Sequence, residues 1–263
     1  MCPPGPVKFS HMQRLPCDGC DQRRQFPRIT AITGLPFFDM PQIDLHDFAM
    51  RYPAEYQAVA ATLERQPFLR DILPDFLHVY HTLLDGFQTG KTLFLCGNGG
   101  SLADCLHLAG ELLKTFKLTR PLSPAAKAAF AGHLHGDLLA EHLQRGLPCQ
   151  VLGMNPALAS AVLNDSPVPA LHYAQELYCF GKPGDLLLGV STSGNALNVQ
   201  YAVTTAQALE MTVIGLTGHA GGKLAELADV ALRVPATETY QIQEQHEVVY
   251  HLLCLLLELR FFL

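Results

Sequence analysis

The chain has 263 residues, of which 49% are hydrophobic and 16% charged, and its formal net charge is −6 with histidine neutral. This composition supports one large domain with extensions, and no basic cluster is dense enough to predict a nucleic-acid partner. We expect neither a signal peptide nor a membrane span, because the most apolar stretch, residues 248–263, is short and contains His251, Glu258 and Arg260. The default expectation is therefore a soluble cytoplasmic protein.

Residues 1–42 are rich in Pro, Gly and Arg without periodicity, which predicts a poorly ordered N-terminal extension. Cys17 and Cys20 form a C-x-x-C pair within it. Without a second pair or nearby histidines, we interpret this pair as a chance occurrence rather than a zinc site. Cysteines further along the chain lie in apolar contexts, where a reduced thiol behaves as a small hydrophobe.

The rest of the chain, residues 43–263, alternates between helical periodicity and short apolar runs. Apolar residues recur at three- and four-residue steps from Asp44 to Phe87, which predicts N-terminal helices. Residues 122–146, rich in alanine and leucine, predict an inserted helical hairpin. Five apolar runs predict parallel strands: Thr92–Cys96, Gln150–Met154, Leu186–Val190, Thr212–Leu216 and Val230–Val234. The expected fold class is therefore α/β, a doubly wound five-stranded parallel sheet flanked by helices, with the insertion at about 122–146.

A glycine-rich turn follows the first predicted strand, in the run Cys96-Gly97-Asn98-Gly99-Gly100-Ser101. Its glycines let the backbone approach a ligand, and the start of the next helix offers N–H groups to an anion. A tight turn capped by Ser101, with no ligand, explains the same residues. Because the spacing is not G-x-G-x-x-G and a P-loop lysine is missing, dinucleotides and ATP are disfavoured.

A second loop, at the end of the strand Leu186–Val190, places three hydroxyl groups in succession on Ser191, Thr192 and Ser193. Helix capping needs one hydroxyl, so we interpret this density as phosphate recognition. Hydroxyls and amides without arginine favour an exchangeable phosphate, such as that of a sugar phosphate. Ligands of such sheets bind outside the carboxyl ends of the strands, where both loops are expected.

Two pairs of polar residues are candidates for metal or proton chemistry. His107 and Glu111 lie four residues apart on the helix after the glycine turn and share a face, either as a site or as a surface pair. Gln243 and His251 lie eight residues apart on the last predicted helix, about 12 Å along its axis. They could share one metal only by leaning towards it, and a buried histidine bonded to a backbone carbonyl is the alternative for His251.

Together these motifs resemble the sugar isomerase (SIS) domain family, and most closely the phosphoheptose isomerases, over roughly Tyr52 to Leu263. The resemblance rests on several ordered motifs: Cys96-Gly97-Asn98-Gly99-Gly100-Ser101, His107-x-x-x-Glu111, Asn164-Asp165, Gly184 through Asn195, Leu216-Thr217-Gly218, Arg233-Val234-Pro235, and Ile242-Gln243-Glu244 with His251. The chain departs from the family at Ala196, where a serine is usual, and at Lys114-Thr115-Phe116, which replaces Gly-Arg-aromatic.

The resemblance implies a homotetramer with active sites at subunit interfaces, one zinc ion per subunit and a phosphorylated sugar as substrate. The implied reaction interconverts sedoheptulose 7-phosphate and D-glycero-D-manno-heptose 7-phosphate through an enediol, with Glu111 as the base and His251 as the acid. The implied zinc ligands are His107, Glu111, Gln243 and His251. The implied substrate-binding residues are Asn98, Gly99, Gly100, Ser101, Glu111, Asn164, Asp165, Ser191, Thr192, Ser193 and Gln243.

Two other functions are compatible with the same fold. One is a non-catalytic SIS module, either a phosphosugar-binding regulator or a replication-initiator-associating assembly factor. Retention of the four ligand positions speaks against it, because a scaffold does not need them. The other is a lyase acting on an amino-sugar phosphate ether, which the C-terminal motif matches less well.

Overall fold

The computed structural model describes residues 45–263, so the expectations for residues 1–42 and for Cys17 and Cys20 lie outside the described residues. Four helical segments precede the sheet: α1 (Leu45–Arg51), α2 (Pro53–Arg65), the 3₁₀ helix η1 (Pro67–Arg70) and α3 (Leu73–Gln88). The strands are β1 (Leu93–Gly97), β2 (Cys149–Val151), β3 (Leu186–Ser191), β4 (Thr212–Thr217) and β5 (Val230–Arg233). The remaining helices are α4 (Gly100–Leu113), α5 (Pro124–Ala128), α6 (Gly136–His142), α7 (Pro156–Asp165), α8 (His172–Phe180), α9 (Leu197–Ala208), α10 (Gly222–Leu227) and α11 (Thr239–Phe262).

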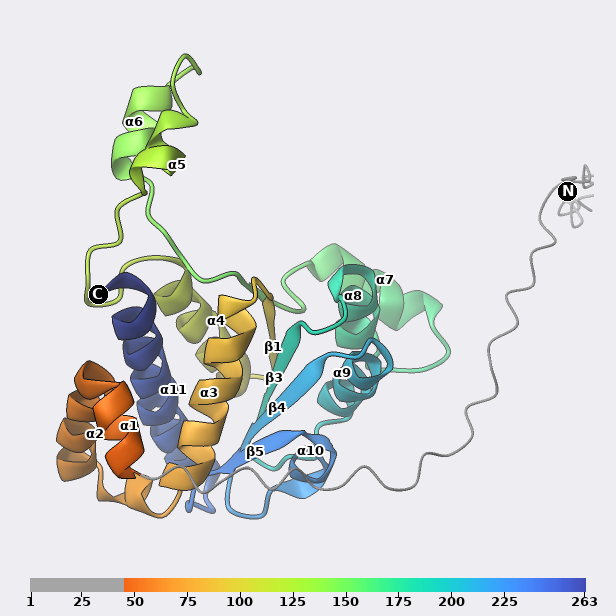
Figure 1. The fold of residues 1–263 in the computed structure, drawn as a ribbon. Helices are drawn as coiled ribbons and strands as arrows, with labels where there is room; N and C mark the ends of the chain where they lie inside the picture. The colour runs from red at the N-terminus through yellow and green to blue at the C-terminus, as the bar shows by residue number, and fades with distance from the viewer. Residues whose placement is uncertain (1–44) are drawn as a thin grey trace, which may run out of the picture. The chain divides into compact units, whose positions relative to one another are not determined.

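Within residues 45–263 the five strands form one parallel sheet in the order β2-β1-β3-β4-β5 (Figure 1). This confirms the expected fold class, and each predicted strand is present with ends shifted by a few residues. The largest shift is at the edge strand β2, which ends at Val151 instead of Met154. Because all strands run in one direction, the loops after them meet at one edge of the sheet, as expected for a ligand site.

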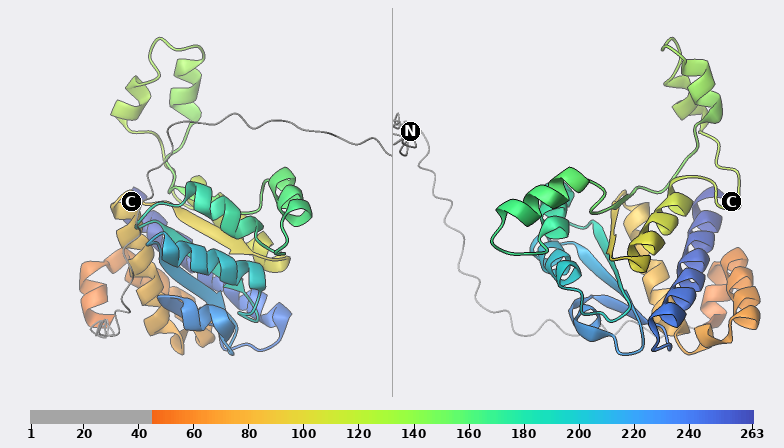
Figure 2. Two further views of the ribbon diagram at one scale, coloured as in Figure 1. Left: turned by 90° about the vertical axis from the view of Figure 1, so that its right-hand side faces the viewer. Right: turned by 180° about the vertical axis from the view of Figure 1, so that it is seen from behind.

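Side chains alternate between the two faces of the sheet and divide the core in two. On β1, Leu93 and Leu95 pack with α2, α3, α4 and α11, whereas Phe94 and Cys96 pack with α8, α9 and α10. Figure 2 shows these two helical layers on opposite sides of the sheet. Strands buried on both faces explain the continuous apolar runs in the sequence.

Helix starts follow local sequence signals in several places. The Asn155 side chain accepts a hydrogen bond from the backbone N–H of Leu158 at the start of α7, and Ser123 caps α5 in the same way through Ala126. Prolines occupy the first turn of both helices, where a missing N–H costs nothing.

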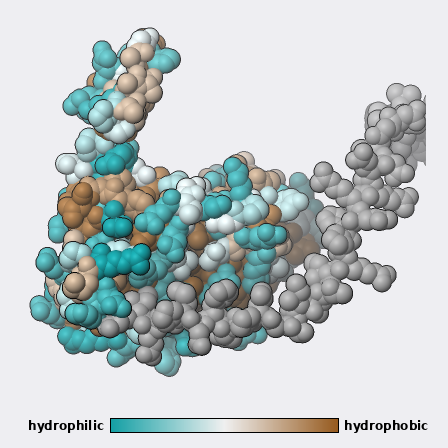
Figure 3. Space-filling model, viewed as in Figure 1, coloured by the Kyte–Doolittle hydropathy of each residue, from teal (hydrophilic) through white to brown (hydrophobic). Residues whose placement is uncertain are grey.

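The segment predicted as an insertion holds α5 and α6, which stand away from the rest of the fold (Figure 1). A single antiparallel bridge between Pro121 and Gln144 joins the two ends of this arm. Leu134 and Leu138 are largely exposed on it, and Figure 3 shows apolar and hydrophilic surface mixed along it. Among residues 45–263, no helix combines the length and the apolar character that crossing a bilayer requires.

Candidate active site

The glycine turn and the hydroxyl loop are tied together at the carboxyl edge of the sheet. The side-chain amides of Asn98 and Asn198 exchange two hydrogen bonds of 2.8 Å, which link the end of β1 to the first turn of α9. The backbone N–H of Gly218 donates to the carbonyl of Thr192, which links the hydroxyl loop to the loop after β4. The structure therefore brings both predicted phosphate loops to one place.

Two glycines shape the first turn. Gly99 has a φ of 56°, in the left-handed region, and directly precedes α4. At Gly100 a Cβ atom would lie 2.2 Å from Nε2 of Gln243, so only glycine allows this amide to approach the start of α4. Ser101 is buried on the first turn of α4. Gln243, predicted as a zinc and substrate ligand, therefore lies against the glycine turn.

The hydroxyl loop uses part of its hydrogen-bonding capacity on its own backbone. Ser191 Oγ accepts from the N–H of Gly194, and Ser193 Oγ accepts from the N–H of Asn195. Ser191 is buried, whereas Ser193 is exposed. Each hydroxyl keeps its own O–H as a donor, so a phosphate role remains a prediction for Ser191, Thr192 and Ser193.

Three of the four predicted metal ligands meet between α4 and α11. His107 Nε2 lies 3.4 Å from Glu111 Oε1 and 3.4 Å from Nε2 of His251. The side chains of His107 and Glu111 are 45% and 22% exposed, so a ligand can reach them. Phe116 stacks on the His251 ring, with centroids 5.8 Å apart and planes at 14°.

Three further residues belong to this cluster and were missed in the sequence. Glu247 lies one turn before His251 on α11, and one of its carboxylate oxygens lies within 4.8 Å of one ring nitrogen of His107 and one of His251. The Tyr250 hydroxyl is hydrogen-bonded to His107 Nδ1 at 2.9 Å. Asp104 lies one turn before His107 on α4, and its Oδ2 is buried without a hydrogen-bond partner in the described part of the chain. Asp104 lies three residues before His107, and Glu247 lies four residues before His251. These helical spacings are the sequence signal that could have identified both residues.

The cluster carries excess negative charge. Burial raises the pKa of Asp104 to about 6, with a further contribution from the charge of Glu247 and an opposing one from His107. Burial and the nearby His107 lower the pKa of His251, against the pull of Glu247 and Glu111. Burial and the carboxylates around it, Asp104 and Glu247 first among them, raise the pKa of Tyr250.

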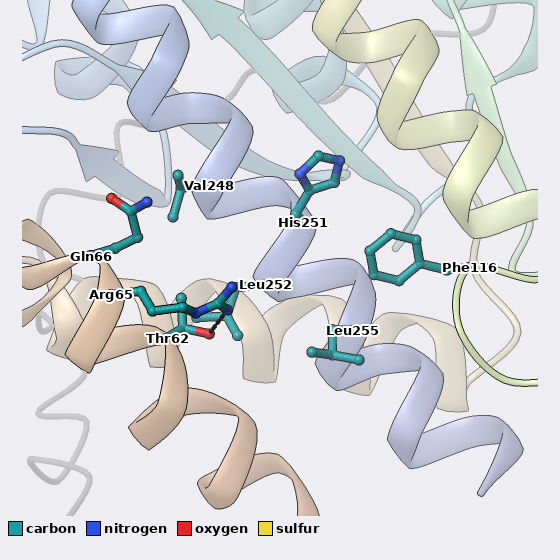
Figure 4. Close-up of a pocket in the computed structure, with 8 residues that line it drawn as sticks. All are labelled: Thr62, Arg65, Gln66, Phe116, Val248, His251, Leu252 and Leu255. Carbon is teal, nitrogen blue, oxygen red and sulfur yellow. Dashed lines mark hydrogen bonds between the residues drawn. The ribbon is translucent and has the colours of Figure 1, made fainter.

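A pocket of about 260 Å³ adjoins His251 between α2 and α11 (Figure 4). Arg65, Gln66 and Thr62 line its α2 side, whereas Phe116 and His251 lie opposite them. Arg65 donates to Thr62 Oγ1 at 3.5 Å, a long contact. A ligand in this pocket would contact both an imidazole and a guanidinium group.

Among residues 45–263, no hydrogen bond or ion pair joins Asn164 or Asp165 to the two phosphate loops or to the cluster around His107. They lie at the C-terminal end of α7, where Asn164 Nδ2 donates to Asp165 Oδ1 at 2.8 Å. Both side chains are exposed. Their predicted role in substrate binding stays a prediction.

The donor set between α4 and α11 fits a divalent transition metal. With Zn–N bonds of about 2.0–2.1 Å, two ligands of a tetrahedral zinc lie about 3.3 Å apart, close to both 3.4 Å separations around His107 Nε2. The hydrogen bond between the Tyr250 hydroxyl and the other ring nitrogen of His107 is the type of contact that orients a metal-bound histidine, whose free N–H donates. Imidazole with carboxylate oxygen is a donor set that suits zinc.

Residues 181–255 match the family model described as the SIS domain. Together with the parallel sheet and the two loops predicted to bind phosphate, this match defines the class of the chain as a SIS-domain protein. The chain is 34% identical over 193 residues to a phosphoheptose isomerase from Geotalea daltonii and 37% identical over 190 residues to one from Rhodospirillum rubrum. These alignments cover 73% and 72% of this chain and 88% of each relative. The chain belongs to the phosphoheptose isomerase family, as the sequence motifs predict.

Solved structures agree with this assignment. A phosphoheptose isomerase from Francisella tularensis superposes with a TM-score of 0.59 at 28% identity, covering 81% of this chain and 97% of that one. One from Neisseria gonorrhoeae superposes with a TM-score of 0.59 at 26% identity over the same shares. The similarity therefore extends over nearly the whole of both relatives.

Proposed function

We propose that this chain is a ketose–aldose isomerase that interconverts sedoheptulose 7-phosphate and D-glycero-D-manno-heptose 7-phosphate. The observation that carries the proposal is the meeting of His107, Glu111 and His251 on the same two helices whose N-terminal parts border the glycine turn. A carbonyl shift between C1 and C2 needs a base and an acid side by side, and this cluster supplies both.

The spacing along α4 suits a seven-carbon sugar phosphate. Seven residues separate Gly100 from His107, a rise of about 10 Å along the helix. An extended heptose 7-phosphate measures about 10 Å from C1 to phosphorus, given ordinary carbon–carbon bond lengths. A phosphate held by Asn98, Gly99, Gly100, Ser101 and the hydroxyl loop would therefore leave C1 and C2 at the cluster, with the N-terminus of α4 favouring the negative charge.

In the reaction that we propose, Glu111 removes one proton from C1 of the ketose while His251 donates a proton to the C2 oxygen. The product of this step is a 1,2-enediol. Glu111 then returns a proton to C2 as the C1 hydroxyl gives its proton to His251, which restores His251 and leaves the aldehyde at C1. Burial and the nearby His107 lower the pKa of His251, which favours the neutral imidazole, and its N–H would serve as the donor.

We further propose one zinc ion per subunit, held by His107, Glu111, Gln243 and His251. When bound, such an ion polarises the sugar carbonyl and stabilises negative charge on oxygen. Three of these side chains have separations that favour the assignment, and Gln243 would complete it from the glycine turn.

A homotetramer with sites at subunit interfaces is part of this proposal. Leu106 and Leu113 are exposed about two turns apart on one face of α4, and a partner subunit packed on this face would bury both. A cytoplasmic location is supported by five free cysteines among residues 45–263, a pattern typical of reducing compartments.

The experiment is conversion of sedoheptulose 7-phosphate by the purified chain with zinc supplied, followed by NMR of the products. We expect the aldose phosphate to accumulate to equilibrium, and a tetramer by light scattering. Failure to convert any seven- or six-carbon ketose phosphate would overturn the proposal and favour a non-catalytic SIS module.

A further inference from the structure

Glu247 belongs to the cluster, and its acidic side chain has no role in the proposed reaction. It lies on α11 four residues after Gln243 and four residues before His251, so all three share one face of the helix. Its carboxylate, His107 Nε2 or Nδ1 and a ring nitrogen of His251 lie within 4.8 Å of one another. Glu247 therefore occupies the gap of about 12 Å that separates Gln243 from His251.

The charge of Glu247 is not matched by a lysine or arginine of the described residues. Within residues 45–263, no lysine or arginine forms an ion pair with Glu247, Glu111 or Asp104. Glu247 faces Asp104 across the α4–α11 junction, and its charge is one of the causes that raise the pKa of that carboxyl. Carboxylates facing each other beside two imidazoles form an arrangement that a cation stabilises.

A glutamate one turn from a histidine on an exposed helix face is often only a surface pair. Here the second imidazole, His107, comes from a different helix and faces the same point, which a surface pair on α11 would not require. Two ring nitrogens at 3.4 Å can share a proton or face a common cation.

We infer that Glu247 is an additional carboxylate ligand of the divalent cation held by His107 and His251. This inference rests on the proposed function. With Glu111 it supplies two negative charges to one divalent ion, so the bound ion is neutralised by this chain itself. The ligand set becomes richer in oxygen than the four positions that the sequence resemblance implies.

The test is the affinity of the whole chain for zinc, measured by competition with a chromophoric chelator, with the visible spectrum of the cobalt(II) form as a second readout. The variant is Glu247→Gln, which keeps the shape and removes the charge. The matched control is Glu244→Gln, three residues earlier on α11, exposed and outside the cluster. Thermal unfolding of each metal-free variant checks that both remain folded.

We expect Glu247→Gln to weaken zinc binding about 10- to 100-fold and to change the cobalt(II) spectrum, and Glu244→Gln to do neither. Wild-type affinity and an unchanged spectrum in Glu247→Gln would overturn the inference, as would a wild-type chain that binds no zinc. The zinc affinity and the cobalt(II) spectrum are measured without the isomerase assay. If the wild-type chain converts sugar while Glu247→Gln binds zinc normally, the proposed function stands and this inference fails.

Discussion

Two junctions, groups of charged and polar side chains, lie where α11 packs against α4 and the segment after it. They differ in whether their polar atoms have hydrogen-bond partners. At one junction Arg120, just beyond α4, pairs with Glu258 at 2.8 Å, and both side chains are 0% exposed. Glu258 also accepts from the backbone N–H groups of Phe116, Lys117 and Leu118. At the other junction, about two turns earlier on α11, two imidazoles face each other and Asp104 Oδ2 lacks a partner.

The difference separates charges that stabilise the fold from those that we propose bind a ligand. A buried ion pair whose hydrogen bonds are all made holds the chain in place, whereas a half-exposed cluster with unmatched groups is completed by a ligand. The first junction also supports the second. Arg120 Nη2 donates to the carbonyl of Glu111 at 3.1 Å, so the buried pair fixes the last turn of α4, from which Glu111 projects.

Glu111→Gln tests the functional junction and carries the largest expected effect. Removing the base should lower kcat about 10²- to 10⁴-fold. The free energy of unfolding should change by less than about 0.5 kcal/mol, because Glu111 is partly exposed and, among residues 45–263, the ion pair of its carboxylate is with His107 alone. Steady-state kinetics and urea unfolding measure both, with Glu226→Gln as a surface control. A large loss of stability with activity retained would show that Glu111 has a structural role and not a catalytic one.

Arg120→Met tests the structural junction. It leaves the buried carboxylate of Glu258 without its cation, which should lower the free energy of unfolding by about 3–5 kcal/mol. The double variant Arg120→Met, Glu258→Gln should recover part of that loss, because no uncompensated charge remains and the amide oxygen can still accept from the backbone N–H groups of residues 116–118. Denaturant unfolding at pH 7 provides the measurement. A single variant as stable as wild type would show that this junction does not hold the fold.

His246 extends the comparison to a third position on α11, where the ring is 0% exposed and neither nitrogen makes a hydrogen bond of normal geometry to a described residue. Burial lowers the pKa of His246 to about 4, from 6.5. The unfolded chain therefore takes up a proton as the pH falls below 6.5 and the folded chain does not, so stability is lost between pH 6.5 and 4. The loss reaches at most about 3 kcal/mol at 1.36 kcal/mol per unit.

The check for His246 is the free energy of unfolding of wild type and His246→Leu at pH 7 and pH 4.5. The variant should lose less stability on acidification than wild type. Equal losses would show that His246 does not contribute to acid sensitivity.

Gly100→Ala and Gly110→Ala form a matched pair on α4 with the smallest expected effects. A Cβ at Gly100 would displace the Gln243 amide, so kcat/KM should fall about tenfold, or about 1.4 kcal/mol. Gly110 has nothing within 4 Å of an added Cβ, so alanine there should raise the free energy of unfolding by up to about 1 kcal/mol. Equal kinetics of the two variants would remove Gln243 from the site.

The sequence predicts the sheet well because its strands are buried on both faces and read as continuous apolar runs. The exception is β2, whose predicted end at Met154 overshoots Val151. It is an edge strand, and the chain turns at Gly153, which has a φ of 84°. The strand therefore ends before the apolar run in the sequence does. Strand order depends on contacts between distant segments, which periodicity does not contain.

The site is predictable where it is local. The contact between His107 and Glu111 follows from their four-residue spacing on one helix. The contact of Gln243 with Gly100 and that of His251 with His107 depend on how α11 crosses α4, so the sequence supports them only through family resemblance. Glu247 was missed because a glutamate on a helix is ordinary until a second helix places an imidazole beside it.

The central claim is that Glu111, between α4 and α11, moves a proton between C1 and C2 of the sugar through an enediol. While Glu111 holds this proton, it exchanges with water. The most direct measurement is the wild-type reaction on sedoheptulose 7-phosphate in D₂O with zinc, followed by NMR and mass spectrometry. We predict deuterium at C2 of the aldose and at C1 of recovered ketose, and only background in Glu111→Gln. Conversion without deuterium in either sugar, or no conversion at all, would contradict the account.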